Sequence, residues 1–333
     1  MTVTLKDVAE RAGVSRSAVS RTFTPGASVS AKTRSKVEQA AAELGYAPSA
    51  LASGLSTGRT KLIGLVSNNF RNPIFLEVFD LFTRAIQDRG LRPLLVNLSE
   101  DSDPGAAIRM LRQYSVDAVI VASSTLTPAF AEDCKAAGLP VVHAFGRATE
   151  QPKVPVVGID NVEAGRMAAR ALLARGYRDI GFLGGPETAT TTQDRLEGLR
   201  QELLGHGGIR LSESFAGGYS HDAGATEMAR LIAAGPLAEA YFCGDDVVAI
   251  GALSALRAAD RNVPRDVGLI GFNDMDAASW GLVNLTTIRQ PLDAIIATSV
   301  ETAITLSEHP DVKPVQKLLS LSLIERGTLK GCI

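Results

Sequence analysis

Cysteine is scarce in this sequence, and the few cysteines present form no structural pattern. Cys134, Cys243 and Cys332 are far apart and odd in number, and no two of them form a Cys-x-x-Cys pair. We therefore expect neither a disulfide framework nor a zinc site, and a reducing cytosol suits such a chain.

The sequence also lacks the motifs of the common enzyme classes. Its four histidines form no cluster by spacing, and there is no Gly-x-Ser-x-Gly, P-loop or His-Glu-x-x-His motif. The glycines of GFLGGP lack the spacing of a dinucleotide-binding loop. Asp245 and Asp246 are neighbours at a predicted helix start, where adjacent carboxylates point in different directions. We expect no enzyme, no cofactor and no metal.

Long apolar runs are absent as well. No run approaches the roughly 20 residues that span a bilayer, and the first residues, MTVTLKDVAERAG, contain no apolar core of a signal peptide. The 45% of hydrophobic residues instead indicates a well-packed globular protein. We predict a cytoplasmic protein without membrane contact, and 333 residues correspond to roughly two to three domains.

Charge is distributed unevenly along the chain. Eight basic and four acidic residues precede Thr60, a balance of +4, whereas the whole sequence has a net charge of −2. A basic N-terminal part on an acidic body suits a chain that binds phosphate groups with its N-terminus. A solvated charged surface is the simpler explanation of the same excess.

Residues 5–21, LKDVAERAGVSRSAVSR, organise the N-terminal part. Apolar residues from Leu5 to Ala12 share one helical face, Gly13 can end that helix, and Ser15 can cap a second one. The second helix would bury Ala18 or Val19 and expose its basic and hydroxyl side chains. Two short helices joined by a glycine turn form a helix-turn-helix, with a surface helical hairpin as the alternative.

A third helix and a linker follow. Ser30 is placed to cap a helix over residues 31–44, and Gly45 is placed to end it. The next segment, SALASGLSTGRT at residues 49–60, is rich in Ala, Ser and Gly. Isolated helices this short are unstable in water, so composition alone indicates a flexible linker.

From residue 61 onward, apolar runs of strand length alternate with amphipathic segments of helix length. The runs are 62–66, 93–96, 118–121, 141–144, 180–183, 240–243 and 267–271, and the main helical segments are 75–88, 106–113, 162–175, 189–204, 223–232 and 247–258. Continuous apolar strands alternating with helices predict parallel sheets covered on both faces. The segment is long enough for two such lobes, with crossings near 158–161 and 286–291. A small ligand would then bind between them, at the carboxyl ends of the strands.

Several motifs in one order resemble the lac repressor (LacI/GalR) family of bacterial transcription regulators. They include TLKDVAERAGVS, VSAKTRSKVEQAAAELGYAPS and STGRTKLIGL near the N-terminus, and NPIF, GYRDIGFLGGP, DDVVAIGA, GLIGFND and LTTIRQP in the body. The resemblance covers nearly the whole chain. It implies an all-α helix-turn-helix head and a periplasmic-binding-protein-like α/β core of two doubly wound parallel-sheet lobes, assembled as a homodimer.

The expected domains are residues 1–46 for the DNA-binding head, 47–60 for a hinge and 61–333 for the effector-binding core. Within the core, the first lobe is expected at about 61–159 plus 291–320, and the second at about 160–290 plus 321–333.

By resemblance, the head carries the DNA contacts. Arg16 would reach a guanine with its bidentate fork and Arg21 a base or phosphate, whereas Thr4, Ser30 and Thr33 would touch backbone. The full set of expected DNA contacts is Thr4, Ser15, Arg16, Ser17, Ser20, Arg21, Ser30 and Thr33 in the head, with Ser49, Ala52, Ser53 and Leu55 in the hinge. The hinge would fold on DNA, and Leu55 would wedge into the minor groove. Ala18 and Ser49 depart from the common Thr and Asn of the family.

By the same resemblance, the effector contacts are Asn68, Phe75, Phe145, Arg195, Tyr219, Asp245 and Asp274. Arginine and aspartate suit the hydroxyl groups of polyols. Asp245 stands where the family commonly has Asn, and Phe145 where a polar residue is common. Two acids and an extra aromatic suggest a sugar or polyol that carries more hydrogen-bond donors, such as an amino sugar, or one with a larger apolar face.

The function implied is an effector-responsive, sequence-specific DNA-binding regulator. A repressor of sugar or related catabolic or transport genes, bound as a dimer to a pseudo-palindromic operator, is the main expectation. An activator, or a ligand receptor with a weak DNA-binding head, is the alternative.

Overall fold

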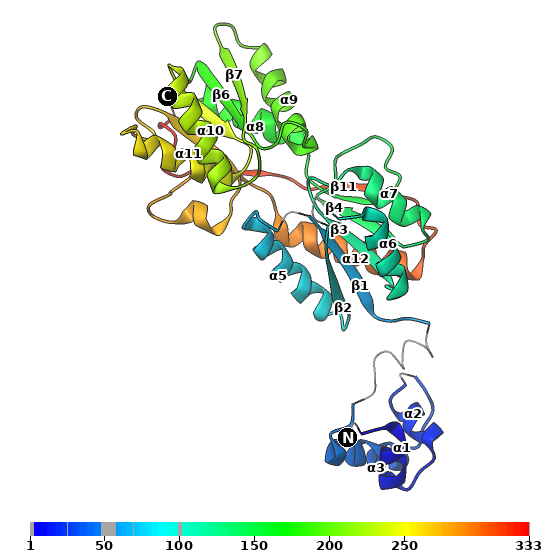
Figure 1. The fold of residues 1–333 in the computed structure, drawn as a ribbon. Coiled ribbons are helices and arrows are strands. Elements are labelled where there is room, and N and C mark those ends of the chain that lie inside the picture. Colours follow the sequence, from blue (N-terminus) through cyan, green and yellow to red (C-terminus); the bar gives the residue numbers. More distant parts are fainter. Residues whose placement is uncertain (1–2, 25, 48–57, 69, 99–101, 333) are drawn as a thin grey trace. The chain divides into compact units, whose positions relative to one another are not determined.

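The computed structural model describes residues 3–24, 26–47, 58–68, 70–98 and 102–332. The chain divides into two compact units between Lys61 and Leu62. The first unit is helical, and the second, called the core below, contains two α/β lobes (Figure 1). The predicted fold class is confirmed.

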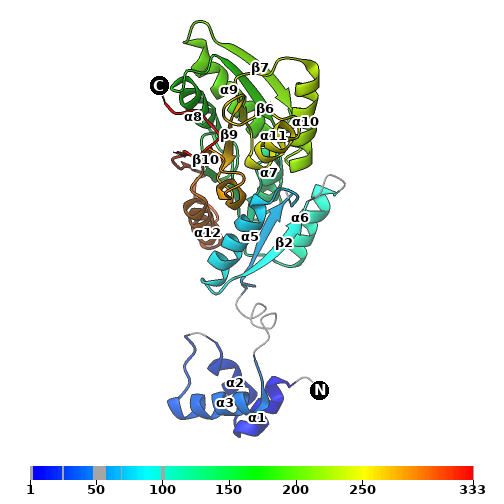
Figure 2. The ribbon, with the colours of Figure 1, turned by 90° about the vertical axis from the view of Figure 1, so that its left-hand side faces the viewer.

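The head consists of three helices, α1 (Leu5–Ala12), α2 (Arg16–Thr22) and α3 (Ala31–Leu44) (Figures 1 and 2). Each helix begins after a residue whose side-chain hydroxyl accepts a hydrogen bond from a backbone N–H of the first turn. These residues are Thr4, Ser15 and Ser30. Gly13 and Gly45 adopt left-handed conformations, which end α1 and α3 without the steric cost of a Cβ. The small core is formed by Val8, Ala9, Val19, Val37, Ala40 and Ala41.

The first lobe is built on a parallel sheet covered by helices on both faces. Its strand order is β11 (Gln316–Leu318), β5 (Val156–Gly158), β4 (Val141–Ala144), β3 (Ala118–Ala122), β1 (Leu62–Ser67) and β2 (Arg92–Asn97). The covering helices are α5 (Ile74–Gln87) and α12 (Leu292–Glu308) on one face, with α6 (Pro104–Gln113) and α7 (Pro128–Ala136) on the other (Figure 2).

The second lobe repeats this plan. Its strand order is β12 (Ser322–Ile324), β10 (Thr287–Arg289), β9 (Gly268–Asn273), β8 (Ala240–Cys243), β6 (Asp179–Gly184) and β7 (Arg210–Phe215). Only β12 runs antiparallel to its neighbour in the described sheet. Its helices are α8 (Asn161–Leu173), α9 (Thr190–Leu204), α10 (His221–Ala234) and α11 (Asp246–Ala258), and a 3-10 turn, η1 (Asp276–Ser279), follows β9.

Close helix packing holds α8 against α9. A Cβ on Gly165 would lie 2.0 Å from the carbonyl oxygen of Arg195, and one on Gly198 would lie 1.8 Å from that of Val162. Glycine at both positions lets the two backbones meet. This contact fixes the turn of α9 that carries Arg195.

The chain passes between the lobes at 159–160, at 290–291 and at 319–321, so each lobe is assembled from separate segments of the described chain. All strands and helices predicted in the core are present. Several short or polar elements escaped prediction, because strands such as β7 (sequence RLSESF) lie at a sheet edge and carry no continuous apolar run. In the described part of the chain, no helix is long and apolar enough to cross a membrane.

Candidate functional site

The outer face of α2 presents the predicted DNA contacts of the head. Arg16, Ser17, Ser20 and Arg21 are exposed, whereas Val19 is fully buried and takes the core position. Two other arginines of the head are engaged: Arg11 pairs with Glu43, and Arg34 donates to the carbonyl oxygen of Thr22. The exposed arginines of α2 are therefore placed for an outside partner.

Three of the predicted DNA contacts are the N-caps of the three helices: Thr4 and Ser30, which were expected to touch backbone, and Ser15, which was expected on the recognition helix. The Ser30 hydroxyl also donates to Thr33 Oγ1 at 2.9 Å. Thr4, Ser15 and Ser30 are nevertheless exposed. Their capping hydrogen bonds therefore fix the orientation of hydroxyl groups that solvent or a partner can still reach. The predicted hinge contacts Ser49, Ala52, Ser53 and Leu55 lie outside the described residues.

A narrow, largely enclosed pocket with an internal volume of about 30 Å³ lies between the lobes of the core. Most of its polar residues follow the carboxyl ends of strands, where open α/β sheets bind ligands. Of the predicted effector contacts, five line it: Phe75, Phe145, Arg195, Tyr219 and Asp245. The residues that sequence reasoning missed are Asn72, Ile74, Val78, Ser124, Ile159, Asn161, Thr191, Asn273 and Gln290.

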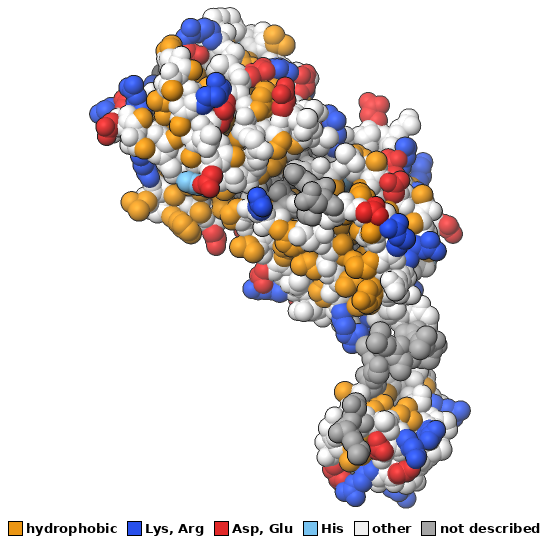
Figure 3. Space-filling model, viewed as in Figure 1, with side chains coloured by type: hydrophobic (Ala, Val, Ile, Leu, Met, Phe, Trp, Pro, Cys, Tyr) orange, Lys and Arg blue, Asp and Glu red, His pale blue; other side chains and the backbone are white. Residues whose placement is uncertain are grey.

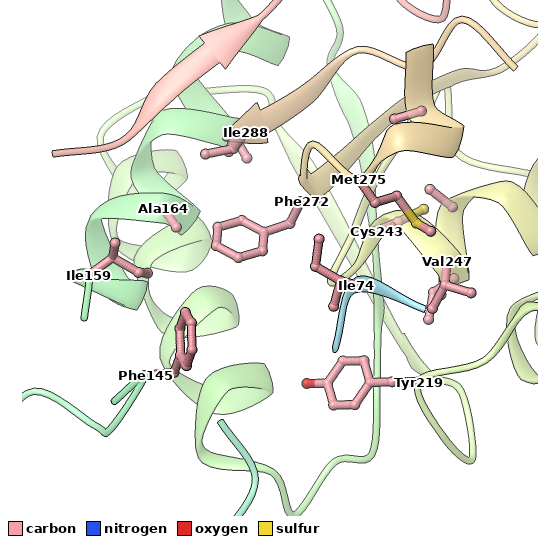
Figure 4. Packing of buried hydrophobic residues seen from close by; sticks show 14 of the residues in the cluster. Ile74, Phe145, Ile159, Ala164, Tyr219, Cys243, Val247, Phe272, Met275 and Ile288 are labelled. Atoms are coloured by element: carbon pink, nitrogen blue, oxygen red, sulfur yellow. The ribbon is translucent and has the colours of Figure 1, made fainter. Parts of the chain in front are cut away.

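The walls of the pocket are apolar and aromatic. Figure 4 shows Phe145 and Ile159 on one side and Tyr219 on the other, with Ile74 between Tyr219 and Phe272. The Tyr219 hydroxyl is 3.0 Å from Thr191 Oγ1 and 2.8 Å from Thr192 Oγ1, so its ring is held in one orientation. Such walls can pack on the apolar face of a ring-shaped ligand.

Arg195 supplies the cationic group of the pocket. Its Nε donates to Asn161 Oδ1 at 2.9 Å, its Nη1 donates to the carbonyl oxygen of Gly244, and its guanidinium lies 3.6 Å from the centre of the Phe272 ring. Burial lowers the pKa of this group, and nearby carboxylates oppose that shift. The guanidinium is thus fixed in position before any ligand arrives.

Asp245 supplies the anionic group. Its Oδ2 accepts from Asn72 Nδ2 and Asn273 Nδ2, both at 2.8 Å, and its Oδ1 accepts from the backbone N–H of Val247. Burial raises the pKa of this carboxyl to about 6, and these hydrogen bonds oppose the shift. Because an ionised carboxylate only accepts, both amides must turn their NH₂ groups toward it. Gln290 Nε2 then donates to Asn273 Oδ1 at 2.7 Å, which extends the chain of bonds to a crossing segment.

Two predicted contacts lie elsewhere. Asp274 is bound between Arg289 and Arg326 on the far side of Asn273, and it lines a different hollow. Asn68 Oδ1 accepts from Ser123 and Thr125 and is not in the pocket lining. The expectation of two pocket carboxylates is therefore wrong: at the end of β9 the side chain that faces the pocket is Asn273.

A second buried carboxylate, Asp246, lies directly behind the pocket. It accepts from Thr287 Oγ1 at 2.6 Å and from the backbone N–H of Met275 at 2.9 Å. Burial raises its pKa to about 7, and the neighbouring Asp245 adds to the shift. No group of three or more His, Cys, Asp or Glu that could hold a metal ion occurs among the described residues.

Comparison with known proteins agrees with this arrangement. The family "Bacterial regulatory proteins, lacI family" matches residues 4–49, and the family "Periplasmic binding protein-like domain" matches residues 169–329. The regulator CelR of Thermobifida fusca is 30% identical over 97% of both chains. The HTH-type transcriptional repressor PurR of an Escherichia coli strain is 32% identical over 98% of this chain and 96% of its own.

The chain belongs to the LacI family of bacterial transcription regulators. A structure of the lac repressor dimer, bound to operator and the anti-inducer ONPF, superposes with a TM-score of 0.89 at 28% identity. It covers 99% of this chain and 100% of the repressor chain. Regulators of the LacI family are not enzymes, which confirms the prediction that this chain is a DNA-binding regulator without catalytic activity.

Proposed function

We propose that this LacI-family regulator is a repressor that binds a pseudo-palindromic operator as a homodimer and is controlled by a small polyhydroxy effector. The proposal depends chiefly on one observation, the buried and fixed pair of Arg195 and Asp245 inside an enclosed pocket. Acting on the bacterial chromosome, such a repressor works in the cytoplasm.

The exposed face of α2 supports the DNA-binding part. The N-terminal part of such a helix enters the major groove, where an arginine fork can bind the two acceptors of a guanine. Arg16 stands at the first position of α2, and Arg21 lies more than a turn later on its exposed side. We assign base recognition to Arg16 and either base or phosphate contact to Arg21, and the hinge contacts of the resemblance are kept as part of the proposal.

The pocket supports a neutral ligand. Asp245 already accepts three protein hydrogen bonds and lies in the field of Arg195, so its charge is largely compensated. A neutral sugar or polyol can share these groups through its hydroxyls and place its apolar face on Phe75, Phe145 or Tyr219. An amino sugar would bring a positive charge into the pocket, where the one carboxylate among its described lining residues, Asp245, is already bound by protein groups.

Exposed apolar side chains support the homodimer. Leu76 on α5 is 72% exposed, Trp280 is 63% exposed and Leu282 is 83% exposed. Glu77 and Ser279 line one hollow, so α5 adjoins the η1 segment there, and we propose that the neighbouring Leu76, Trp280 and Leu282 belong to one surface. Hydrophobic side chains are visible over this part of the core in Figure 3. A second copy of the chain is the partner we propose for it.

The experiment that tests the function selects DNA from genomic fragments with the purified full-length chain and measures the affinity for the recovered duplex. Arg16→Ala should weaken binding about 10-fold or more, since one bidentate arginine–guanine contact is worth about 1–3 kcal/mol. Arg11→Ala is the matched control, because Arg11 is equally exposed on the head but pairs with Glu43. Equal losses for both variants would contradict the assignment.

The same assay then tests the effector class with neutral sugars and polyols, amino sugars and purine bases added one at a time. We expect a change of duplex affinity with a neutral polyhydroxy compound. A response confined to amino sugars or to purines would overturn the effector assignment while leaving the operator intact.

A further inference from the structure

Two side-chain contacts join the lobes beside the pocket. Arg147 follows β4 in the first lobe, and its Nε and Nη2 donate to Asp194 Oδ2 and Oδ1 on α9 of the second lobe, at 3.1 and 2.5 Å. Asn72, just before α5 of the first lobe, donates to Asp245 of the second lobe. The first contact is a bidentate ion pair, and the second is a buried hydrogen bond.

The ion pair connects two segments, one in each lobe, and each segment carries a residue that lines the pocket. Arg147 lies two residues beyond Phe145, and Asp194 directly precedes Arg195. Phe145 and Arg195 both line the pocket. The position of the Arg147 guanidinium therefore bears on how these two walls are spaced.

The pair differs from an ordinary surface ion pair. The Asp194 side chain is only 12% exposed, whereas Arg147 is 43% exposed. An ion pair with bidentate geometry and one nearly buried partner contributes measurably to stability. Because Arg147 is partly exposed, salt can still screen this pair. The Asn72–Asp245 bond is buried and lacks that sensitivity.

We propose that Arg147 is a positioning residue of the pocket, whose ion pair with Asp194 holds the two lobes in the arrangement that places Phe145 opposite Arg195. Lobes of this type close around ligands by hinge motion at their crossing segments. Removing or screening the pair therefore increases the population of more open arrangements. The link to effector response rests on the proposed function, but the lobe arrangement is measured without any ligand.

The test is hydrogen exchange of the full-length chain followed by mass spectrometry. In Arg147→Ala we expect two- to fivefold faster exchange in pocket-wall segments of both lobes, at the start of α5 and the start of α11, since exchange reports the open population. The matched control is Arg200→Ala. Arg200 lies on α9, as Asp194 does, and it also forms a bidentate pair, with Glu213, but within the second lobe.

The double variant Arg147→Asp with Asp194→Arg reverses the pair and should return exchange toward the wild-type rate. In wild-type protein, raising salt to about 1 M, where the screening length falls to about 3 Å, should speed the same segments. Arg147→Ala should not respond to that change. The proposal is overturned if exchange in Arg147→Ala changes only in its own loop, or if salt affects both proteins equally.

Discussion

At the scale of single residues, the core is organised by two adjacent carboxylates with different tasks. Asp245 faces the pocket and binds amides from both lobes, whereas Asp246 points the other way and binds Thr287 and the backbone of Met275. Sequence reasoning excluded a catalytic pair because neighbours at a helix start diverge, and the two sets of partners show that divergence. Their burial makes both of them costly to ionise.

Asp246 should impose a pH dependence on stability. Its folded-state pKa of about 7 lies above the ordinary value of 3.8, so the folded protein binds this proton more tightly than the unfolded chain does. The resulting contribution to the free energy of unfolding is fully present below about pH 4. It is lost progressively as pH rises to about 7. We expect Asp246→Asn to remove the part of this trend that Asp246 contributes, while Asp245, with its pKa raised to about 6, gives a trend of the same sign that both proteins share. The difference in unfolding free energy between wild type and Asp246→Asn should change by about 2–4 kcal/mol between pH 4 and pH 7.

Urea unfolding of the full-length chain at several pH values measures this difference. His143 has a pKa lowered to about 4 by burial, so it gives an opposite trend that both proteins share. Asp311→Asn, at an exposed position, is the control and should follow wild type. Identical pH profiles for Asp246→Asn and wild type would refute the assignment.

At the scale of elements, function depends on helices that begin and pack in defined ways. The N-cap hydroxyls of the head double as expected DNA contacts, so helix start and DNA surface are set by the same side chains. In the second lobe, α8 and α9 meet through Gly165 and Gly198, and Asn161 at the start of α8 reaches Arg195 on α9. The pocket arginine is therefore positioned by a helix–helix contact.

Gly198→Ala should disrupt that contact, because the added Cβ would lie 1.8 Å from the carbonyl oxygen of Val162. Overpacking of this kind costs about 1–3 kcal/mol. Gly217→Ala is the control, since its Cβ would meet no atom within 4 Å. Calorimetric unfolding should show a lowered midpoint for Gly198→Ala alone, and equal midpoints for the two variants would argue against the close packing.

At the scale of the whole molecule, the proposed regulation uses a core that is two-lobed and, in the homodimer proposed above, paired with a second copy. The chain crosses between the lobes at three places, so any movement of one lobe passes through short segments next to the pocket. One of these contains Gln290, which ends the chain of hydrogen bonds from Asp245. The pocket and a segment that crosses between the lobes are thus joined by hydrogen bonds.

Placing charge on the proposed dimer surface should separate the subunits. We expect the double variant Leu76→Glu and Leu282→Glu to sediment as a monomer at concentrations where wild type is dimeric, because buried charges oppose apolar association. Leu204→Glu is the matched control, since Leu204 is 85% exposed at the end of α9 and lies outside this surface. A variant that remains dimeric would place the interface elsewhere.

The sequence by itself determined the local features of this protein. The cap residues, the glycines that end α1 and α3 and the continuous apolar strands depend on interactions within a few residues. The head helices and the central strands could therefore be predicted. Edge strands such as β7 and β11 could not be predicted, because most of their residues are exposed or half-buried and form no continuous apolar run.

Only the tertiary structure decided which side chains meet. Asn273, rather than Asp274, lines the pocket because its amide binds Asp245, whereas Asp274 pairs with Arg289 and Arg326. Asn72 reaches Asp245 although 173 positions separate them. Arg147 and Asp194 lie on different lobes and become partners only when both lobes are folded. Contacts of this kind depend on distances set by the whole fold, which no local spacing encodes.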